Sequence, residues 1–156
     1  MRRMDLAITD EREIDEMILR CDCCRLAFAD GKHPYIVPLN FGFRWEDGVR
    51  VFYFHGAAAG RKVDLIRSLG YAGFELDTNH QLHPHEKPCD FSMGYQSVVG
   101  EGEIKEITDL EEKTQALQVI MKQVSGRDDW AFPPTVLSKT GVFRLAVTEL
   151  CARGHR

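Results

Sequence analysis

Residues 35–55, YIVPLNFGFRWEDGVRVFYFH, decide the fold because they contain two strand patterns separated by a turn. Apolar side chains alternate through the first half, which predicts one long strand; they are Tyr35, Val37, Leu39, Phe41 and Phe43. Pro38 interrupts this strand, so we expect it to lie at a sheet edge or at a bulge. Asp47-Gly48 predicts a tight turn into Val49–His55, where apolar residues on both faces indicate a central, buried strand.

Patterns on either side extend this pair into a larger sheet with helices. Further strands are predicted at residues 25–29, 71–77, 97–107 and 142–150. Helices are predicted at 11–20 after an Asp10-x-x-Glu13 cap, at 59–69, and from Thr108-x-x-Glu111 to Gly126. Residues 78–92 lack periodicity, which predicts a loop. We therefore expect one mainly β domain over residues 1–156, with about six antiparallel strands and helices packed outside.

Size and composition argue against several classes of protein. The chain has 156 residues and a mass of 17.8 kDa, with 44% hydrophobic and 28% charged residues, as in one globular domain. A net charge of -4 argues against a nucleic-acid partner. No apolar run is long enough for a membrane span or a signal peptide, so we expect a cytoplasmic protein. Five cysteines, three of them crowded at Cys21, Cys23 and Cys24, suit reduced thiols.

The densest chemical pattern follows the central strand, in residues 53–62, YFHGAAAGRK. A buried strand leads into small residues, which let a ligand approach the backbone, and then into a helix start that carries Arg61 and Lys62. The free N–H groups and the dipole of a helix N-terminus attract an anion, and basic residues in that turn oppose the dipole unless an anion compensates them. The pattern fits either a phosphate site or an ordinary strand–loop–helix connection with a solvated basic pair.

Two other patterns are weaker. The loop segment His80-x-x-His83-x-His85, with Glu86, Cys89 and Asp90 after it, contains side chains that bind zinc. Its spacing fits no pair of ligands on one helix face and Pro84 divides it, so a polar surface loop is favoured and no metal is expected. Gly100 and Gly102 within the 97–107 strand predict close approach by another backbone or by a ligand.

Several motifs occur together in the order and spacing of a known family. They are Met1-Arg2-Arg3, Ile8-Thr9-Asp10, residues 34–42, residues 53–57, Gly60-Arg61-Lys62, residues 89–93, Tyr95-x-Ser97-Val98-Val99-Gly100-x-Gly102 and Gly126-Arg127. On these motifs, which cover nearly the whole chain, the sequence resembles the pyridoxamine 5′-phosphate oxidase-related flavoproteins. Within that family it is similar to the nitroimidazole-resistance (Nim) proteins.

The resemblance implies a split β-barrel that forms a homodimer and binds flavin mononucleotide (FMN) at the subunit interface. The residues along the flavin ring would be Pro38, Leu39 and Asn40. The residues at the ribityl-phosphate end would be Phe54, His55, Gly56, Ala57, Arg61 and Lys62. The neighbouring strand or the partner subunit would contribute Tyr95, Ser97 and Val98. His55 would act in catalysis near the flavin or orient the phosphate.

The function that the resemblance implies is an FMN-dependent oxidoreductase that passes electrons to a small organic acceptor such as a nitroimidazole. The alternative is a flavin- or haem-binding carrier or sensor without turnover, since related split barrels bind deazaflavin or haem. Pyridoxamine-phosphate oxidases are longer and end in a substrate-binding segment containing Arg-Leu-Ala-Pro. Here Arg144-Leu145-Ala146-Val147 lacks the proline, so that vitamin-oxidase activity is not expected.

Overall fold

The structure is a computed structural model that describes residues 4–155, so the Met1-Arg2-Arg3 motif lies outside the described residues. The strands are β1 (Ala7–Ile8), β2 (Cys24–Asp30), β3 (His33–Leu39), β4 (Phe41–Glu46), β5 (Val49–Ala57), β6 (Tyr71–His83), β7 (Ser92–Ile107) and β8 (Thr140–His155). The helices are α1 (Glu11–Arg20), α2 (Arg61–Leu69), α3 (Leu110–Ser125) and α4 (Pro134–Leu137), with short 3-10 turns η1 (Met4–Leu6) and η2 (Pro88–Asp90). The mainly β fold with flanking helices is therefore confirmed.

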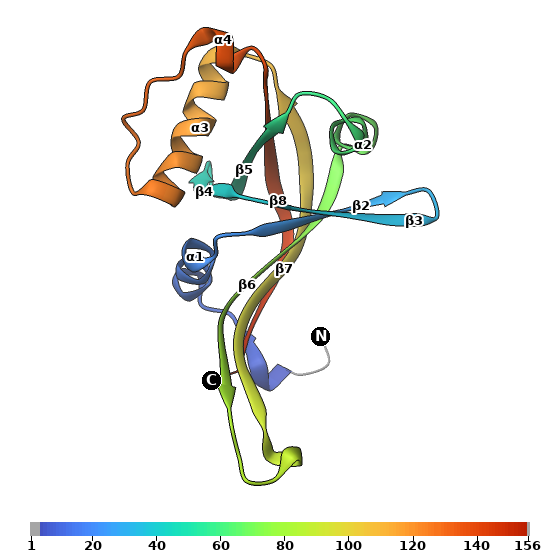
Figure 1. The fold of residues 1–156 in the computed structure, drawn as a ribbon, viewed down its shortest axis with the longest axis vertical. Helices are drawn as coiled ribbons and strands as arrows, with labels where there is room; N and C mark the ends of the chain where they lie inside the picture. Colours follow the sequence, from blue (N-terminus) through green and yellow to red (C-terminus); the bar gives the residue numbers. More distant parts are fainter. Residues whose placement is uncertain (1–3, 156) are drawn as a thin grey trace.

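The sheet is antiparallel and curves until its two edges meet. Its strand order is β3-β2-β6-β7-β8-β5-β4, with β1 paired to β8. β3 and β4 lie at opposite ends of this order, yet Asn40 alone separates them along the chain. Because consecutive Cα atoms are only about 3.8 Å apart, the two edges must come together here, as in a split barrel. In Figure 1, the β2–β3 hairpin crosses the long strands β6, β7 and β8.

The predicted strand over 35–43 is therefore wrong, because it is two strands on different edges. The chain leaves β2 at Leu39 and joins β5 at Phe41, which pairs with Phe54. The Asn40 side chain between them donates a hydrogen bond to the Asp22 carbonyl, at 2.9 Å. Pro38 lies on edge strand β3, as expected. This division, together with the two-residue β1, raises the number of strands from the expected six to eight.

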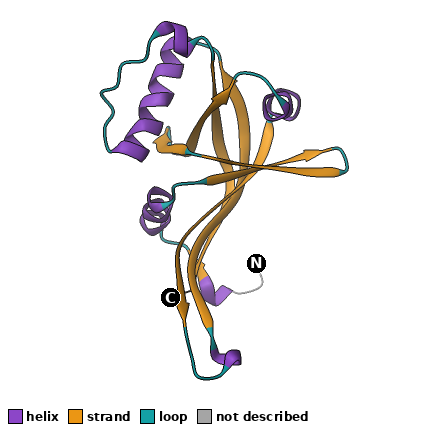
Figure 2. Cartoon of the chain, viewed as in Figure 1, coloured by secondary structure: helices purple, strands orange, loops and turns teal. Residues whose placement is uncertain are grey.

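Two hydrophobic cores lie on the two faces of β5. Phe52 and Phe54 point into the larger core inside the curved sheet, which α1 and α2 cover. Val51 and Tyr53 point into a smaller core beneath α3. β5 is thus buried on both faces, as predicted. Figure 2 shows α3 and α4 on one side of the sheet and α2 beside the β2–β3 hairpin.

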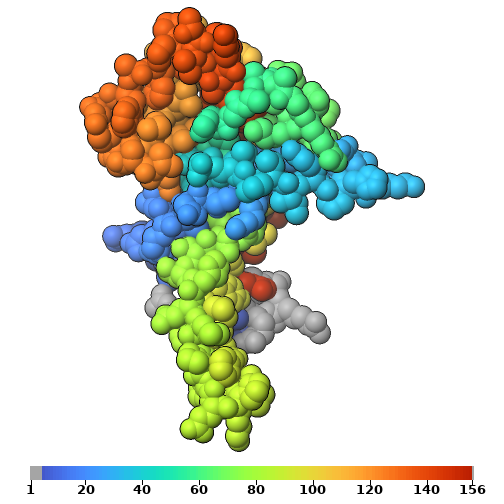
Figure 3. Space-filling model, viewed as in Figure 1, coloured from blue at the N-terminus to red at the C-terminus, as the bar shows by residue number. Residues whose placement is uncertain are grey.

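The predicted loop over 78–92 is wrong at its start, because residues 78–83 extend β6. β6 continues to His83 and β7 begins at Ser92, so the connection is confined to residues 84–91. The pairing of β6 with β7 shifts register between Thr78 and Gln81, and Asn79 there has a positive φ of 56°. In Figure 3 this yellow-green hairpin projects from the body of the molecule.

Smaller differences concern helix boundaries and strand glycines. Asp109, rather than Thr108, caps α3, since its carboxylate accepts a hydrogen bond from the Glu112 N–H at 2.9 Å. Val124, near the end of α3, is exposed. The close approach predicted at Gly102 is made by a backbone: a Cβ there would lie 2.2 Å from the Ala146 carbonyl oxygen, where the ladder shifts register.

Candidate functional site

The start of α2 is an open helix N-terminus. Gly60 precedes the helix with a φ of 117°, and it has no side chain to cap the first turn. Its carbonyl accepts hydrogen bonds from the N–H groups of Val63 and Asp64. Within residues 4–155, no acceptor pairs with the backbone N–H groups of Arg61 and Lys62. Free N–H groups and the positive end of the helix dipole favour an anion at this position.

Lys62 places an unpaired positive charge beside this turn. Its ammonium lies 5.3 Å from the centre of the Phe143 ring and has no ion pair or hydrogen bond within residues 4–155. A Cβ at Gly56 would lie only 2.6 Å from Lys62 Nζ, so the glycine is what makes room for the ammonium. Burial lowers the pKa of Lys62 below its ordinary value. Burial removes water that would stabilise the charged ammonium. An anion at this position would restore that stabilisation.

His55 lies near the end of β5, one residue before Gly56 and opposite Val142 of β8. Although part of the ring is open to solvent, the surrounding protein displaces water, and this burial lowers the pKa of the imidazole. The Lys62 ammonium lowers it further. The imidazole is therefore biased towards its neutral form while this place holds no anion. A negative group between the two side chains would shift both pKa values back upwards.

Arg61, the other basic residue of the predicted pair, is already engaged. Its Nε donates to Asp30 Oδ2 at 2.8 Å, and its Nη2 lies 2.7 Å from the same oxygen. The guanidinium carbon lies 4.6 Å from the centre of the Tyr35 ring. Asp30 and Tyr35 belong to the β2–β3 hairpin, so this contact joins the hairpin to the start of α2. Both basic residues thus lie at the helix start, but within residues 4–155 only Arg61 of the two has an ion pair.

The residues expected along a flavin ring lie close to His55. Pro38, Leu39 and Asn40 run directly into β4, whose first residue, Phe41, pairs with Phe54 next to His55. Pro38 and Asn40 are exposed, whereas Leu39 is partly buried. Phe54 itself is fully buried, so its side chain belongs to the core rather than to a surface site.

Tyr95, Ser97 and Val98 lie far from His55 in the same chain. His55 pairs with Val142, which pairs with Ile107 near the end of β7. Tyr95 lies twelve residues earlier on that strand, which corresponds to about 40 Å at roughly 3.3 Å per residue. The Val98 side chain is fully buried. One chain therefore does not bring this group together with His55 and Lys62.

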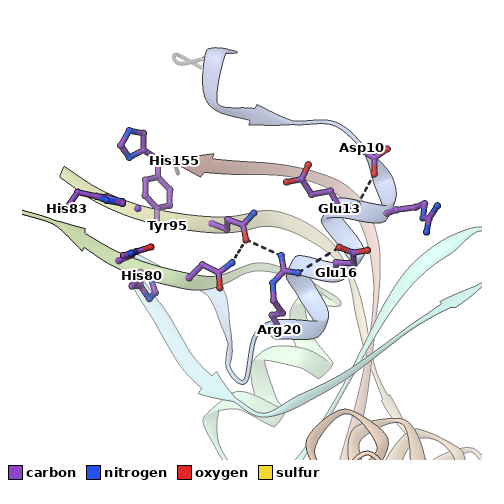
Figure 4. A pocket seen from close by; sticks show the side chains of 13 residues that line it. Asp10, Glu13, Glu16, Arg20, His80, His83, Tyr95 and His155 are labelled. Carbon is purple, nitrogen blue, oxygen red and sulfur yellow. Dashed lines mark hydrogen bonds and ion pairs between the residues drawn. The ribbon is translucent and has the colours of Figure 1, made fainter.

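A separate polar cavity of about 950 Å³ lies between α1 and the far ends of β6, β7 and β8. Its lining residues are Asp10, Arg12, Glu13, Glu16, Arg20, Asn79, His80, Gln81, His83, Gly94, Tyr95, Gln96 and His155. Figure 4 shows the histidines and Tyr95 at one end and the α1 side chains at the other. Arg20 joins α1 to β7 through a hydrogen bond from Nη2 to Gln96 Oε1, at 3.1 Å.

Three histidines line this cavity, and their hydrogen-bond partners differ. His80 Nε2 lies 2.8 Å from Asp77, and His155 Nδ1 lies 3.1 Å from the Met93 carbonyl oxygen. His83 Nε2 is buried without a hydrogen-bond partner in the part of the chain described. The sequence pattern pointed to His80 and His83, but His85 lies outside the lining and His155 was missed. Across residues 4–155, no group of three or more His, Cys, Asp or Glu side chains is placed to hold a metal.

Arg144 belongs to a cluster of polar side chains that hydrogen-bond one another. It donates two hydrogen bonds to Glu46 Oε2, at 3.0 and 2.7 Å, and Arg44 and Tyr53 also bond this carboxylate. Burial alone would raise the pKa of Glu46, but the hydrogen bonds from Tyr53, Arg144 and Arg44 lower it to about 2. The Nε–Nη2 edge of the Arg144 guanidinium is therefore occupied by an internal carboxylate. This arrangement ties β4 and β5 to β8.

The cysteines show no sign of reactive-thiol chemistry at the helix end. All five are free thiols. Burial raises the pKa of Cys21 to about 12, with the carboxylates of Asp77 and Glu75 adding to the effect. Burial also raises the pKa of Cys24. Because the thiolate is the nucleophile, buried thiols of this kind are inert at neutral pH.

Comparison with known proteins identifies the family and similar folds. The model of the family described as Pyridoxamine 5′-phosphate oxidase matches residues 10–154. A solved structure described as a 5-nitroimidazole antibiotic resistance protein from Bacteroides thetaiotaomicron is 25% identical, with a TM-score of 0.81 over 97% of this chain and 90% of that one. No curated protein matches the chain.

Two further solved structures are similar in fold. A flavocytochrome from Azotobacter vinelandii is 18% identical, with a TM-score of 0.82 over 100% of this chain and 72% of that one. The FAD- and haem-binding protein from Mycobacterium smegmatis is also 18% identical, with a TM-score of 0.80 over 96% of this chain and 73% of that one.

Among the residues described here, no helix is both long and apolar enough to cross a membrane.

Proposed function

Because the chain belongs to the pyridoxamine 5′-phosphate oxidase family, we propose that it is an FMN-dependent oxidoreductase that passes electrons to a small organic acceptor. One observation carries the proposal: the uncapped start of α2 lies beside the unpaired Lys62 ammonium, which Gly56 accommodates. A phosphate monoester fits these groups because it has a negative charge and several acceptor oxygens.

We propose the following contacts between this chain and the parts of FMN. The phosphate would accept hydrogen bonds from Lys62 Nζ and from the free N–H groups of the first turn of α2. Pro38, Leu39 and Asn40 would lie against the ring, close to His55. Reduced flavin supplies a hydride or electrons, whereas the protein binds and orients it and excludes water. His55 would hold or deliver a proton through its imidazole nitrogen, close to the acceptor.

A nitroimidazole is the acceptor class that we propose. The support is the similarity, at 25% identity, to the protein described as a 5-nitroimidazole antibiotic resistance protein. We do not propose oxidation of pyridoxamine phosphate. The segment Arg144-Leu145-Ala146-Val147 lacks the proline of the substrate-binding segment of those oxidases.

A haem-binding carrier is the second candidate. The observation that favours it is the cavity lined by His80, His83 and His155, because imidazole is a common axial ligand of haem. Charged side chains of α1 line the same cavity, however, and they offer little to the apolar faces of a porphyrin. The absorption spectrum of the purified protein separates the two: a yellow flavin spectrum supports our proposal, and a Soret band supports haem.

We expect the protein, loaded with FMN and reduced without oxygen, to be reoxidised by a nitroimidazole faster than free reduced FMN. The protein fixes the distance and orientation of donor and acceptor, and this accelerates the reaction. Stopped-flow absorbance of the flavin band measures the rate, with free FMN at equal concentration as the control. A rate equal to that of free FMN would leave a flavin carrier as the function.

We also expect a homodimer, since Tyr95 and Ser97 would join His55 in a flavin site only from a second chain. Symmetric dimers are the commonest assembly of soluble proteins. Light scattering during gel filtration should give about twice the chain mass of 17.8 kDa. Absorbance recorded on the same peak should give one FMN per chain. A monomer that retains FMN would contradict a site shared between two chains.

A further inference from the structure

The contact between Arg61 and the β2–β3 hairpin uses only one edge of the guanidinium. Asp30 offers a single oxygen, Oδ2, to both Nε and Nη2 of Arg61. Arg carries five N–H donors in a rigid planar group, and these two contacts use the side edge of that group. The end edge, made by Nη1 and the second N–H of Nη2, has no acceptor in the described part of the chain. Arg61 can therefore bind Asp30 and an anion simultaneously.

The hairpin also contacts the guanidinium through an aromatic ring. Tyr35 lies under it, with 4.6 Å between the guanidinium carbon and the ring centre. Tyr35 is itself held by its cross-strand partner Phe28, which is buried in the core, with 6.3 Å between the ring centres. Asp30 binds one edge of Arg61, and the Tyr35 ring lies against the guanidinium carbon. Both residues belong to the β2–β3 hairpin rather than to the helix that carries Arg61.

Stability is a poor explanation for this arrangement. The Arg61 and Asp30 side chains are 53% and 40% exposed, and ion pairs this exposed to solvent contribute little to folding. Binding has more to gain, because an exposed arginine loses much rotamer freedom when a ligand immobilises it. A guanidinium that is already immobilised loses less on binding, so the affinity for the ligand is higher.

We propose that Asp30 and Tyr35 are positioning residues that hold Arg61 ready for the phosphate of the bound flavin. This inference rests on the proposed function, because it needs an anion at the start of α2. It makes the β2–β3 hairpin part of the phosphate site and assigns the two basic residues different roles. Lys62 is a free charge at the helix start, and Arg61 is a fork whose orientation the hairpin sets.

The test compares Asp30→Asn with Asp30→Ala. Both variants remove the same negative charge, but only asparagine keeps a side-chain oxygen that can accept from Arg61 Nε. We expect the alanine variant to bind FMN about five-fold more weakly than the asparagine variant, because an ordered side chain is lost. Tyr35→Leu, which changes no charge, should weaken FMN binding to a similar extent. Riboflavin, which lacks the phosphate, should bind all of these variants as it binds the parent.

Fluorescence titration with FMN and riboflavin measures these affinities, and an Arg61→Ala background provides the control. There, Asp30→Asn and Asp30→Ala should bind FMN equally, since nothing remains to be positioned. Equal FMN affinity of the two variants in the parent background would overturn the positioning role while leaving the phosphate site intact. A parent that binds FMN and riboflavin equally would overturn the phosphate site and this inference together. Losses that affect riboflavin and FMN alike would show a structural role instead.

Discussion

Replacing Arg61 and Lys62 together with alanine is expected to weaken FMN binding by about 100-fold or more. Each residue would lose a hydrogen bond between charged groups, worth about 1.5–3 kcal/mol, and about 1.4 kcal/mol corresponds to a factor of ten. The fold should survive, because both side chains lie at the surface end of α2 and the buried face of that helix is made by Val63, Leu65 and Ile66. Titration of flavin fluorescence measures the loss, and circular dichroism checks the fold.

A matched control removes two positive charges elsewhere. Arg67 and Lys122 are exposed and pair with Glu106 and Asp128 at the surface. Their double alanine variant has the same net charge as the Arg61/Lys62 variant, yet it should bind FMN as the parent does. If both double variants lost the same affinity, overall charge would explain the effect. Unchanged FMN affinity in the Arg61/Lys62 variant would remove these residues from the site.

The second large effect is expected at His55. With glutamine there, flavin should remain bound, whereas nitroimidazole reduction should slow by about 100-fold, the contribution typical of an acid or base group. Glutamine keeps hydrogen-bonding ability but cannot titrate. In the parent the rate should rise as the pH falls through the pKa of His55, which burial and Lys62 set below its ordinary value when no anion is present. The variant should lose that pH dependence.

Single-turnover oxidation of the pre-reduced, fully occupied protein provides the measurement for His55. His85→Gln is a suitable control, because that histidine is exposed in the 84–91 connection. A variant rate within about twofold of the parent would rule out proton transfer by His55. Weaker FMN binding with an unchanged rate per bound flavin would show that His55 only anchors the cofactor.

Most of the fold could be predicted from local patterns, but strand partners could not. The alternation from Tyr35 to Phe43 continues unbroken through Asn40, because the chain passes from one sheet edge to the other without turning its apolar face. A period of two reports which face is buried and does not report which strand supplies the hydrogen bonds. The extension of β6 to His83 was hidden for another reason. Its register shift and its solvent-exposed end remove the alternation that identifies a strand.

The candidate site was predictable where it depends on adjacent residues. The strand end, the small residues and the helix start at His55–Lys62 follow one another in sequence, and the structure keeps them together. Contacts between distant segments were not predictable. The engagement of Arg61 by Asp30 depends on how the hairpin lies against α2, and the presence of His155 beside Tyr95 depends on the register of β7 and β8.

Whether the start of α2 holds the phosphate of a flavin can be measured by comparing FMN with riboflavin. The two molecules share the ring and the ribityl chain and differ in the phosphate alone. Titration of the unmodified protein with each should show FMN binding at least about tenfold more tightly, as expected for one or more charged hydrogen bonds. Equal affinity for the two, or no binding of either, would mean that the start of α2 does not hold a flavin phosphate.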